Sequence, residues 1–399
     1  MTKVAGKAPG RPVASGITKQ SSNCCLLGLL WLYGKGNLMN GNLRGAVVAT
    51  QTLLALVLSA CNSGTAEPPA QANQPTTKAQ SHAVRRAYTP ACPCEYIADI
   101  KGSSTNPGAV IIDPVTANGN YNPGTNVIVG SNTGLQSPAG IALDSASNIY
   151  VTNMGNSSVT VYAAGSAGNV APFATISGTN TLLSNPFGIV LDSSDNIYVA
   201  NGLNTGSASV TVYAAGSNGN VAPVRTITGT LTGLADPSGI AVDPPGRIFV
   251  GNENTPSLNG FVTVYNTGAN GNVAPLRTIS GANTGFSNGV YGVAWHNRKI
   301  YVTSGNSAVS SRIGIFPAAS NGNVAPTKSI SGSATALNAP VGITVTPNNR
   351  IYVANVGGIS VTLYKAYVNL AFGNNNIPPF KYVVGGSTQF DAPYGITAR

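Results

Sequence analysis

Short apolar runs separated by Gly, Asn, Ser and Pro follow one another along the chain beyond residue 92. Hydrophobic residues in these runs alternate with polar ones, or are β-branched and aromatic, which is typical of β-strands. Between residues 140 and 178 four runs read GIALD, NIYVTN, SVTVYAAG and FATISG. No segment after residue 61 keeps a helical period for three turns. The pattern therefore predicts an all-β protein.

The set of four runs is repeated. The phrase PAGIALDSASNIYVTN returns in altered form four times, and a glycine near its start recurs 48 to 53 residues apart. These glycines are Gly140, Gly188, Gly239, Gly292, Gly342 and Gly395. That spacing is the length of a propeller blade. Four antiparallel strands repeated radially make a β-propeller.

The number of blades follows from the first and last repeats. The last repeat stops at PYGITAR, which supplies only an innermost strand, whereas CEYIADI near residue 95 matches the second strand NIYVAN. GAVIIDP, ANGNYNPG and NVIVG follow in the order of the rest of a blade. We predict six four-stranded blades: residues 95–137 with 393–399, then blades beginning near Pro138, Pro186, Pro237, Val290 and Pro340. The C-terminal strand completes the N-terminal blade, closes the ring and protects its edge.

These repeats resemble the NHL family of six-bladed propellers over about residues 95–399. The family unit reads roughly Pro-x-Gly-Ile-x-x-Asp, then Asn-Ile-Tyr-Val-x-Asp or Asn, then an aliphatic and aromatic third strand. That third strand often carries Arg in the family but reads SVTVY here. A further motif, GNVAP, precedes the fourth strand at Gly168, Gly219, Gly271 and Gly322. Gly and Asn supply left-handed backbone and Pro ends strand pairing, so we interpret it as a structural turn.

The first sixty residues predict an export signal. The apolar run from Gly45 follows Arg44 and ends in LSAC at Cys61, which resembles the lipobox of bacterial lipoproteins. In that family the chain is cut before the Cys, which is then acylated, so Cys61 is the predicted lipid attachment site. Met39 would give a signal peptide of ordinary length. The alternative is a transmembrane helix, but the run is short for one.

The predicted organisation has four parts. They are residues 1–38 as an over-long start, 39–60 as the lipoprotein signal peptide, 61–91 as a flexible tether and 92–399 as the propeller. The tether is rich in Pro, Ala, Gln, Thr and Ser without an apolar period. Asn62 rather than Asp follows Cys61, which by resemblance to enteric sorting indicates the outer membrane, facing the periplasm or the exterior. A secreted protein is the alternative.

The net charge of +10 falls once the leader is removed. Residues 1–60 hold six basic residues and no acidic ones, which leaves 15 basic and 11 acidic residues. No basic stripe remains, so we expect no nucleic-acid partner. Arg225, Arg277 and Lys328 recur after AP in the fourth strand, and we interpret them as solvated charges that block the outer edge. Cys92 and Cys94 remain outside the leader, either as a tight Cys-x-Cys disulfide or paired between chains.

One face of the ring is the candidate binding surface. Its loops between second and third strands differ between blades, reading MGNS, GLNTGSA, ENTPSLNG, SGNSAVS and VGG. Variable loops on a repeated frame usually carry specificity. At the channel mouth the middle residue of each P-x-G entry forms a ring: Tyr394, Ala139, Phe187, Ser238, Tyr291 and Val341. This alternation of large and small side chains either fills a tapered centre or forms an aromatic-walled ligand site.

A second ring closes the second strands. Its members carry side-chain oxygens: Asp99, Asn153, Asn201, Asn252, Ser304 and Asn355. Such oxygens suit Ca²⁺, and the channels of lactonase-type propellers also use Asn and Asp. The alternative is that each Asn caps its own turn.

Catalytic residues are scarce. His82 lies in the tether and His296 on the face opposite the variable loops, so the histidines on which amidating and streptogramin lyases rely are missing. Glu253 and Asp99 remain as general bases near the mouth, although we expect exposed, solvated loop carboxylates there. Two function classes result. The first is a monomeric, non-catalytic envelope lipoprotein that binds a partner protein, peptide or glycan. The alternative is a calcium-dependent lactonase, esterase or lyase.

Overall fold

The computed structural model describes residues 93–100, 108–202, 208–253, 259–365 and 370–399. The chain separates into two units, residues 1–79 and 80–399, and all described residues belong to the second. The predicted signal peptide, Cys61 and the tether lie outside the described residues. Nearly every described element is a β-strand, and no helix among them is long and apolar enough to span a membrane.

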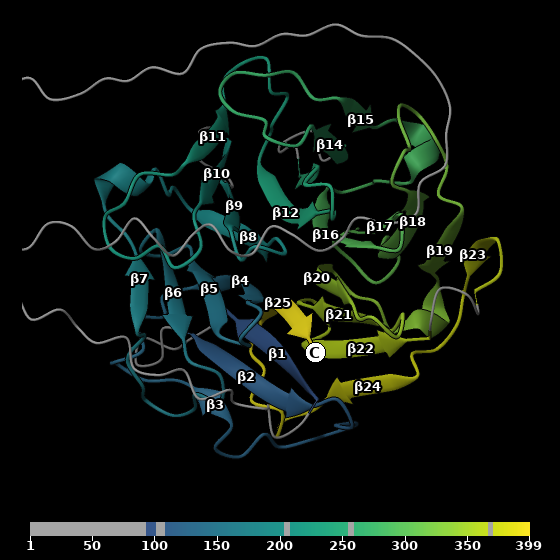
Figure 1. The fold of residues 1–399 in the computed structure, drawn as a ribbon. Helices are drawn as coiled ribbons and strands as arrows, with labels where there is room; N and C mark the ends of the chain where they lie inside the picture. Colours follow the sequence, from purple (N-terminus) through teal and green to yellow (C-terminus); the bar gives the residue numbers. More distant parts are fainter. Residues whose placement is uncertain (1–92, 101–107, 203–207, 254–258, 366–369) are drawn as a thin grey trace, which may run out of the picture. The chain divides into compact units, whose positions relative to one another are not determined.

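The strands form six sheets, which are the blades of a propeller (Figure 1). Blade 1 has β25 (Pro393–Ala398), β1 (Cys94–Asp99), β2 (Ala109–Pro114) and β3 (Val127–Ile128). Blade 2 has β4 (Pro138–Leu143), β5 (Ile149–Asn153), β6 (Ser158–Tyr162) and β7 (Ala174–Ile176). Blade 3 has β8 (Pro186–Leu191), β9 (Ile197–Asn201), β10 (Ser209–Tyr213) and β11 (Arg225–Thr228).

The second half of the ring repeats this plan. Blade 4 has β12 (Pro237–Val242), β13 (Ile248–Asn252), β14 (Phe261–Tyr265) and β15 (Arg277–Ile279). Blade 5 has β16 (Val290–His296), β17 (Lys299–Ser304), β18 (Arg312–Pro317) and β19 (Lys328–Ser331). Blade 6 has β20 (Pro340–Val345), β21 (Ile351–Asn355), β22 (Ser360–Tyr364) and β24 (Lys381–Val384). Within the described residues, three short 3-10 helices lie between the fourth strand of one blade and the first of the next: η1 (Thr179–Thr181), η2 (Ala282–Thr284) and η3 (Ser333–Thr335).

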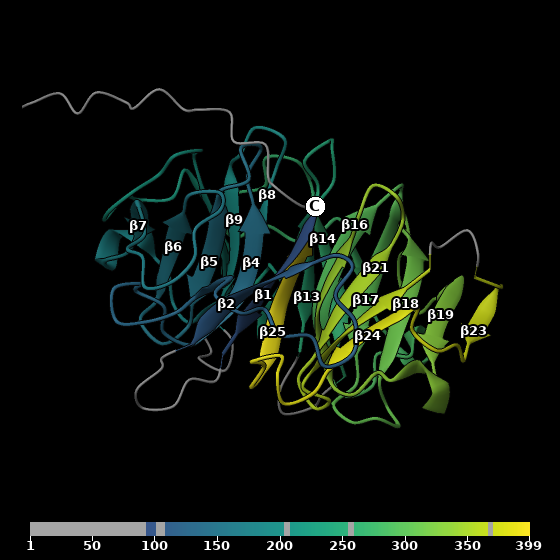
Figure 2. The same ribbon diagram turned by 90° about the horizontal axis from the view of Figure 1, so that it is seen from below.

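The predicted closure of the ring is confirmed. β25 pairs antiparallel with β1, with Ile396 opposite Ile97, so the C-terminal strand is the inner strand of blade 1. Figure 2 shows β25, in yellow, beside the blue strand β1. Inner strands contact one another in the order β4, β8, β12, β16, β20, β25 and back to β4. Hydrophobic clusters between neighbouring blades make the core, for example Ile97 of blade 1 with Val361 and Leu363 of blade 6.

The recurring glycines mark where inner strands come closest. A Cβ atom on any of them would lie 2.2 to 2.5 Å from backbone of the next inner strand, for example 2.3 Å from the Phe187 carbonyl oxygen at Gly140. No side chain larger than hydrogen fits such a contact. The period of the repeat is therefore also the period of the tightest packing around the channel.

The GNVAP motif does more than form the predicted turn. Its first residue makes a parallel bridge to the fourth strand of the preceding blade, as Gly271 does with Ile227. The following Asn reaches further, since Asn272 Oδ1 accepts a hydrogen bond of 2.8 Å from the Leu231 amide. Gly229, with φ of 116°, leaves room for that side chain. We call this contact the asparagine latch.

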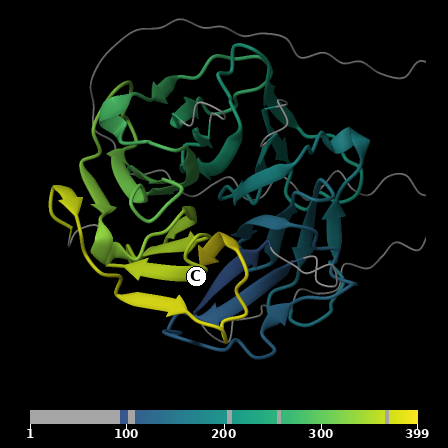
Figure 3. The same ribbon diagram turned by 180° about the vertical axis from the view of Figure 1, so that it is seen from behind.

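Six equivalent latches run around the ring. The asparagines are Asn120, Asn169, Asn220, Asn272, Asn323 and Asn376. In blade 6 the same segment is longer and forms β23 (Gly373–Asn375), which pairs parallel with β19 of blade 5. Figure 3 shows this yellow segment beside the neighbouring blade. Asn120 latches blade 1 onto blade 6 through the Ser387 amide, at 2.7 Å.

The interpretation of Arg225, Arg277 and Lys328 as solvated edge charges is wrong. Arg277 Nη2 donates to the Ala318 carbonyl of the next blade at 2.9 Å, and Lys328 Nζ donates to the Leu370 carbonyl at 2.6 Å. Lys328 is 6% exposed. These side chains point along the blade interface rather than outward, because the carbonyl groups at the end of the next blade need donors.

Candidate binding site at the channel mouth

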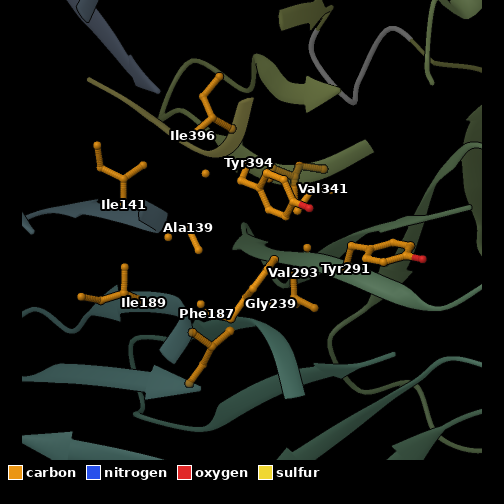
Figure 4. Close-up of a pocket in the computed structure, with 17 residues that line it drawn as sticks. Ala139, Ile141, Phe187, Ile189, Gly239, Tyr291, Val293, Val341, Tyr394 and Ile396 are labelled. Atoms are coloured by element: carbon orange, nitrogen blue, oxygen red, sulfur yellow. The ribbon is translucent and has the colours of Figure 1, made fainter. Parts of the chain in front are cut away.

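Five of the six predicted mouth residues line one cavity. They are Ala139, Phe187, Tyr291, Val341 and Tyr394, at the start of the inner strands of five blades. The Phe187 and Tyr394 rings meet edge to face, with centroids 5.8 Å apart and planes at 69°. Figure 4 shows these side chains around the cavity, whose volume is about 70 Å³. Drug-sized ligands occupy pockets of roughly 300 Å³ or more, so this cavity suits one chemical group of a ligand.

Ser238, the sixth member of the ring, does not line this cavity. It is fully buried, and its hydroxyl donates to the Val290 carbonyl of the next blade at 2.6 Å. In blades 2 and 5 a threonine of the second strand binds the carbonyl one residue further along the next inner strand, as Thr152 does with Phe187. Blade 4 has Gly251 at the threonine position, and there Ser238 makes a side-chain hydrogen bond to the next blade. The geometry gives it a role in holding blades together.

Glu253, directly after the second strand of blade 4, is buried, contrary to the expectation of an exposed loop carboxylate. It follows β13 directly and is 8% exposed, and its amide donates to the Asp236 carbonyl at 3.1 Å. Met154 and Val356 occupy the same place in blades 2 and 6, and both pack against the cluster of Ala139, Phe187 and Val341. The repeat therefore directs this position toward the mouth.

Burial and the neighbouring Asp236 raise the pKa of the Glu253 carboxyl to about 8. The charge of Glu253 in turn affects the pKa values of the two tyrosines. Burial first, and then the Glu253 charge, raise the pKa of Tyr291 to about 12, and the same causes raise the pKa of Tyr394. Both phenols therefore stay neutral at physiological pH, while Glu253 titrates near it.

The second predicted ring of residues, whose side chains carry oxygen atoms, lies away from the cavity. Asn153, Asn201, Asn252 and Asn355 are fully buried, and each Oδ1 accepts a hydrogen bond from the amide 17 residues earlier, at 2.9 to 3.4 Å. Asp99 accepts from the Asp391 and Ala392 amides at 2.8 and 3.0 Å. Each residue thus fastens the loop that enters its own blade. Because each of these oxygens already accepts a backbone hydrogen bond at the entry of its own blade, the donor set does not fit a shared calcium ion.

Other reactive groups are dispersed. No cluster of three or more His, Cys, Asp or Glu residues suited to a metal occurs in the described ranges. His296 Nε2 lies 2.8 Å from Asn349 Oδ1 of the next blade. Cys94 forms a disulfide bond, and its partner lies outside the described residues.

The variable-loop face is acidic in its described part. Its loops and adjoining strand ends carry four carboxylates and one guanidinium among the residues that the structure describes. These are Asp99, Asp236, Glu253 and Asp391, with Arg312. The described part of this face therefore carries more carboxyl groups than cationic groups around the aromatic mouth.

Comparison with known proteins supports the fold. No protein-family model and no curated protein matches the chain. The crystal structure of a nidogen/laminin complex contains a similar chain, 15% identical, with 76% of this chain and 97% of that chain covered and a TM-score of 0.50. A protein of unknown function from Bacteroides caccae is 11% identical, with 77% and 98% covered and a TM-score of 0.51. The described chain is a six-bladed β-propeller, closed by its C-terminal strand.

Proposed function

We propose that the protein is a non-catalytic binding module of the bacterial cell envelope, of the NHL type and held by lipid on Cys61. In this proposal the channel mouth takes one end group of a larger partner protein, peptide or glycan. The observation that supports it is the convergence of Phe187, Tyr291 and Tyr394 from three blades on one small cavity. The similar propeller in the nidogen/laminin complex offers a parallel in which this fold takes part in a protein complex.

Loss of the tyrosine walls should abolish ligand binding. We expect the double substitution Tyr291→Ala and Tyr394→Ala to weaken capture on arrays of envelope glycans and peptides at least about 10-fold, because aromatic side chains dominate such contacts. Circular dichroism and the melting temperature report whether the propeller remains folded. The matched control is Phe173→Ala with Phe380→Ala, which removes two rings that are 58% and 62% exposed at the outer rim. Equal binding by the mouth variant and the control would place the ligand elsewhere.

A calcium-dependent lactonase, esterase or lyase is the second candidate. Glu253 favours it, because a buried carboxyl with a pKa of about 8 is suited to act as a general base. The hydrogen-bonded Asn and Asp ring provides no support, so we derive no step through calcium.

Addition of millimolar calcium to the EDTA-treated protein should shift the melting temperature by less than about 1 °C, since a ligand stabilises only the state that binds it. Magnesium at the same concentration is the control for ionic strength. A saturable rise of several degrees with calcium alone would contradict the binding module, favour the metal-dependent enzyme and justify lactone and ester screens.

A further inference from the structure

We infer that the end group held at the channel mouth is a cationic ammonium group, bound between the Glu253 carboxylate and the rings of Phe187, Tyr291 and Tyr394. This inference rests on the proposed function and names the chemistry of its ligand. It accounts for an acidic side chain in a place where other blades carry apolar residues or glycine.

Glu253 and Tyr291 are brought together by two strands in contact. β13 of blade 4 packs against β16 of blade 5. Gly251 lies against Val290 so closely that a Cβ atom on it would be 2.7 Å from Cγ1 of Val290. Glu253 follows Gly251 by two residues, and Tyr291 follows Val290 by one. Met154 and Val356 hold the Glu253 position in blades 2 and 6, and both pack against the same hydrophobic cluster as Tyr291 and Tyr394. The repeat therefore turns the Glu253 position toward this cluster, and in agreement with that the Glu253 charge raises the pKa of both phenols.

The Glu253 carboxylate has no counter-ion among the described residues. Salt bridges there join Arg247 to Asp243 and Lys381 to Glu95, and neither includes Glu253. No hydrogen bond to its carboxyl group occurs within that part of the chain either, and its oxygens are not among the fully buried, unpartnered atoms there, so they keep some contact with solvent. A largely buried carboxylate without a partner among the described residues is costly, so the protein either holds it protonated or gains when a cation arrives.

The aromatic walls favour the same ligand. The faces of Phe and Tyr rings carry negative potential and attract a cation within about 6 Å of the ring centroid. Phe187 and Tyr394 stand edge to face, so the two rings present walls of different orientation. An anionic group would meet the four carboxylates of the described face against one guanidinium. A neutral group would supply no counter-ion when Glu253 ionises.

Choline and its uncharged analogue 3,3-dimethylbutan-1-ol test the inference directly, because they differ in charge and hardly in shape. We expect calorimetric titration of the full chain in a non-ionic detergent to show choline binding at least about 10-fold tighter than the alcohol. The pair n-butylammonium and butan-1-ol separates a primary amine from a quaternary one. Preference for either ammonium over its neutral counterpart supports the inference, and preference for neither overturns it.

Glu253→Gln keeps the size of the side chain and removes its charge. It should weaken ammonium binding at least about 10-fold and leave the alcohol unaffected, whereas Asp391→Asn, an exposed and solvent-screened acid on the same face, should change ammonium binding less than about 2-fold. Ammonium affinity should rise between pH 6 and 9 in the native protein as Glu253 ionises beside Asp236, Tyr291 and Tyr394, and this rise should vanish in Glu253→Gln.

The outcomes separate the inference from the proposed function. Equal binding of ammonium and alcohol, lost in Tyr291→Ala with Tyr394→Ala, would keep the mouth as the site and remove the cation. Ammonium binding that survives Glu253→Gln would also remove the role of this carboxylate. Failure of both probes to bind would overturn the cation inference, while the array experiment, which does not depend on charge, decides the binding function.

Discussion

Replacement of Gly188 by alanine should lower the free energy of unfolding by more than about 3 kcal/mol, which is among the largest effects expected of one added methyl group. The new Cβ atom would lie 2.2 Å from the Ser238 carbonyl oxygen and 3.2 Å from the Ile240 amide nitrogen. Both are backbone atoms of the neighbouring inner strand, which cannot move aside without disturbing the next blade. Strain at this point is therefore passed to the whole ring.

The measurement is urea unfolding of the full chain, followed by circular dichroism. Gly386→Ala is the matched control, because nothing lies within 4 Å of a Cβ atom there and its backbone is not left-handed. That control should stay within about 0.5 kcal/mol of the native protein. If both variants unfold at the same urea concentration, the inner strands are further apart than described.

Replacement of Lys381 by methionine should cost about 3–5 kcal/mol at pH 8, because it leaves buried carboxyl groups without their cation. Lys381 Nζ lies 3.0 and 2.9 Å from the two carboxylate oxygens of Glu95 and donates to the Val115 carbonyl at 3.2 Å. Asp113 is paired directly across from Glu95, and neither of its buried carboxylate oxygens has a hydrogen-bond partner among the described residues. One ammonium from blade 6 thus faces two carboxyl groups of blade 1 at the ring closure.

This arrangement also sets the pH dependence of stability. Burial, opposed by Lys381, raises the pKa of Glu95 from 4.5 to about 7 and that of Asp113 from 3.8 to about 6. The folded protein therefore binds these protons more tightly than the unfolded chain does. The resulting stabilisation is complete below pH 4 and is lost as the pH rises to about 7. We expect native stability to fall over that range.

In Lys381→Met the free energy of unfolding should fall more steeply with rising pH. The variant should therefore be close to native stability at pH 5 and far below it at pH 8. Urea midpoints at the two pH values measure this difference. Arg225→Met is the control at the equivalent place in blade 3, where the guanidinium donates to Tyr198 Oη and the Ala269 carbonyl. It should lose about 1–2 kcal/mol with little pH dependence. A pH-independent loss in Lys381→Met would mean that the carboxyl groups are not the cause.

The fold could be predicted because the strands of each blade can be recognised within a short stretch of sequence. Alternation in NIYVTN and SVTVY defines two strands without reference to the rest of the chain, and the match of CEYIADI to a second strand predicted how the ring closes. The mouth cavity was also predictable, since every P-x-G entry starts an inner strand on the same face. Repetition supplied the three-dimensional information that a single segment lacks.

Contacts between blades could not be predicted in the same way. Asn272 was interpreted as part of a turn, because its partner, the Leu231 amide, is 41 residues away. The sequence alone predicts a solvated Arg277 for a similar reason, since its acceptor, the Ala318 carbonyl, lies in the next blade. The burial of Glu253 did have a signal, since the equivalent residues Met154 and Val356 are apolar, but it appears only when the blades are aligned at that position. The roles of these polar residues become clear only when their partners in the neighbouring blade are known.

The order of synthesis on the ribosome gives the closing strand a further consequence. β1 is translated before blades 2 to 6, yet its inner neighbour β25 emerges only after all of them. Throughout that interval the nascent chain carries an unpaired strand edge, which is a template for pairing with other chains. Premature termination before β25 leaves this edge open permanently. Its product is an aggregation-prone polypeptide rather than a slightly smaller propeller.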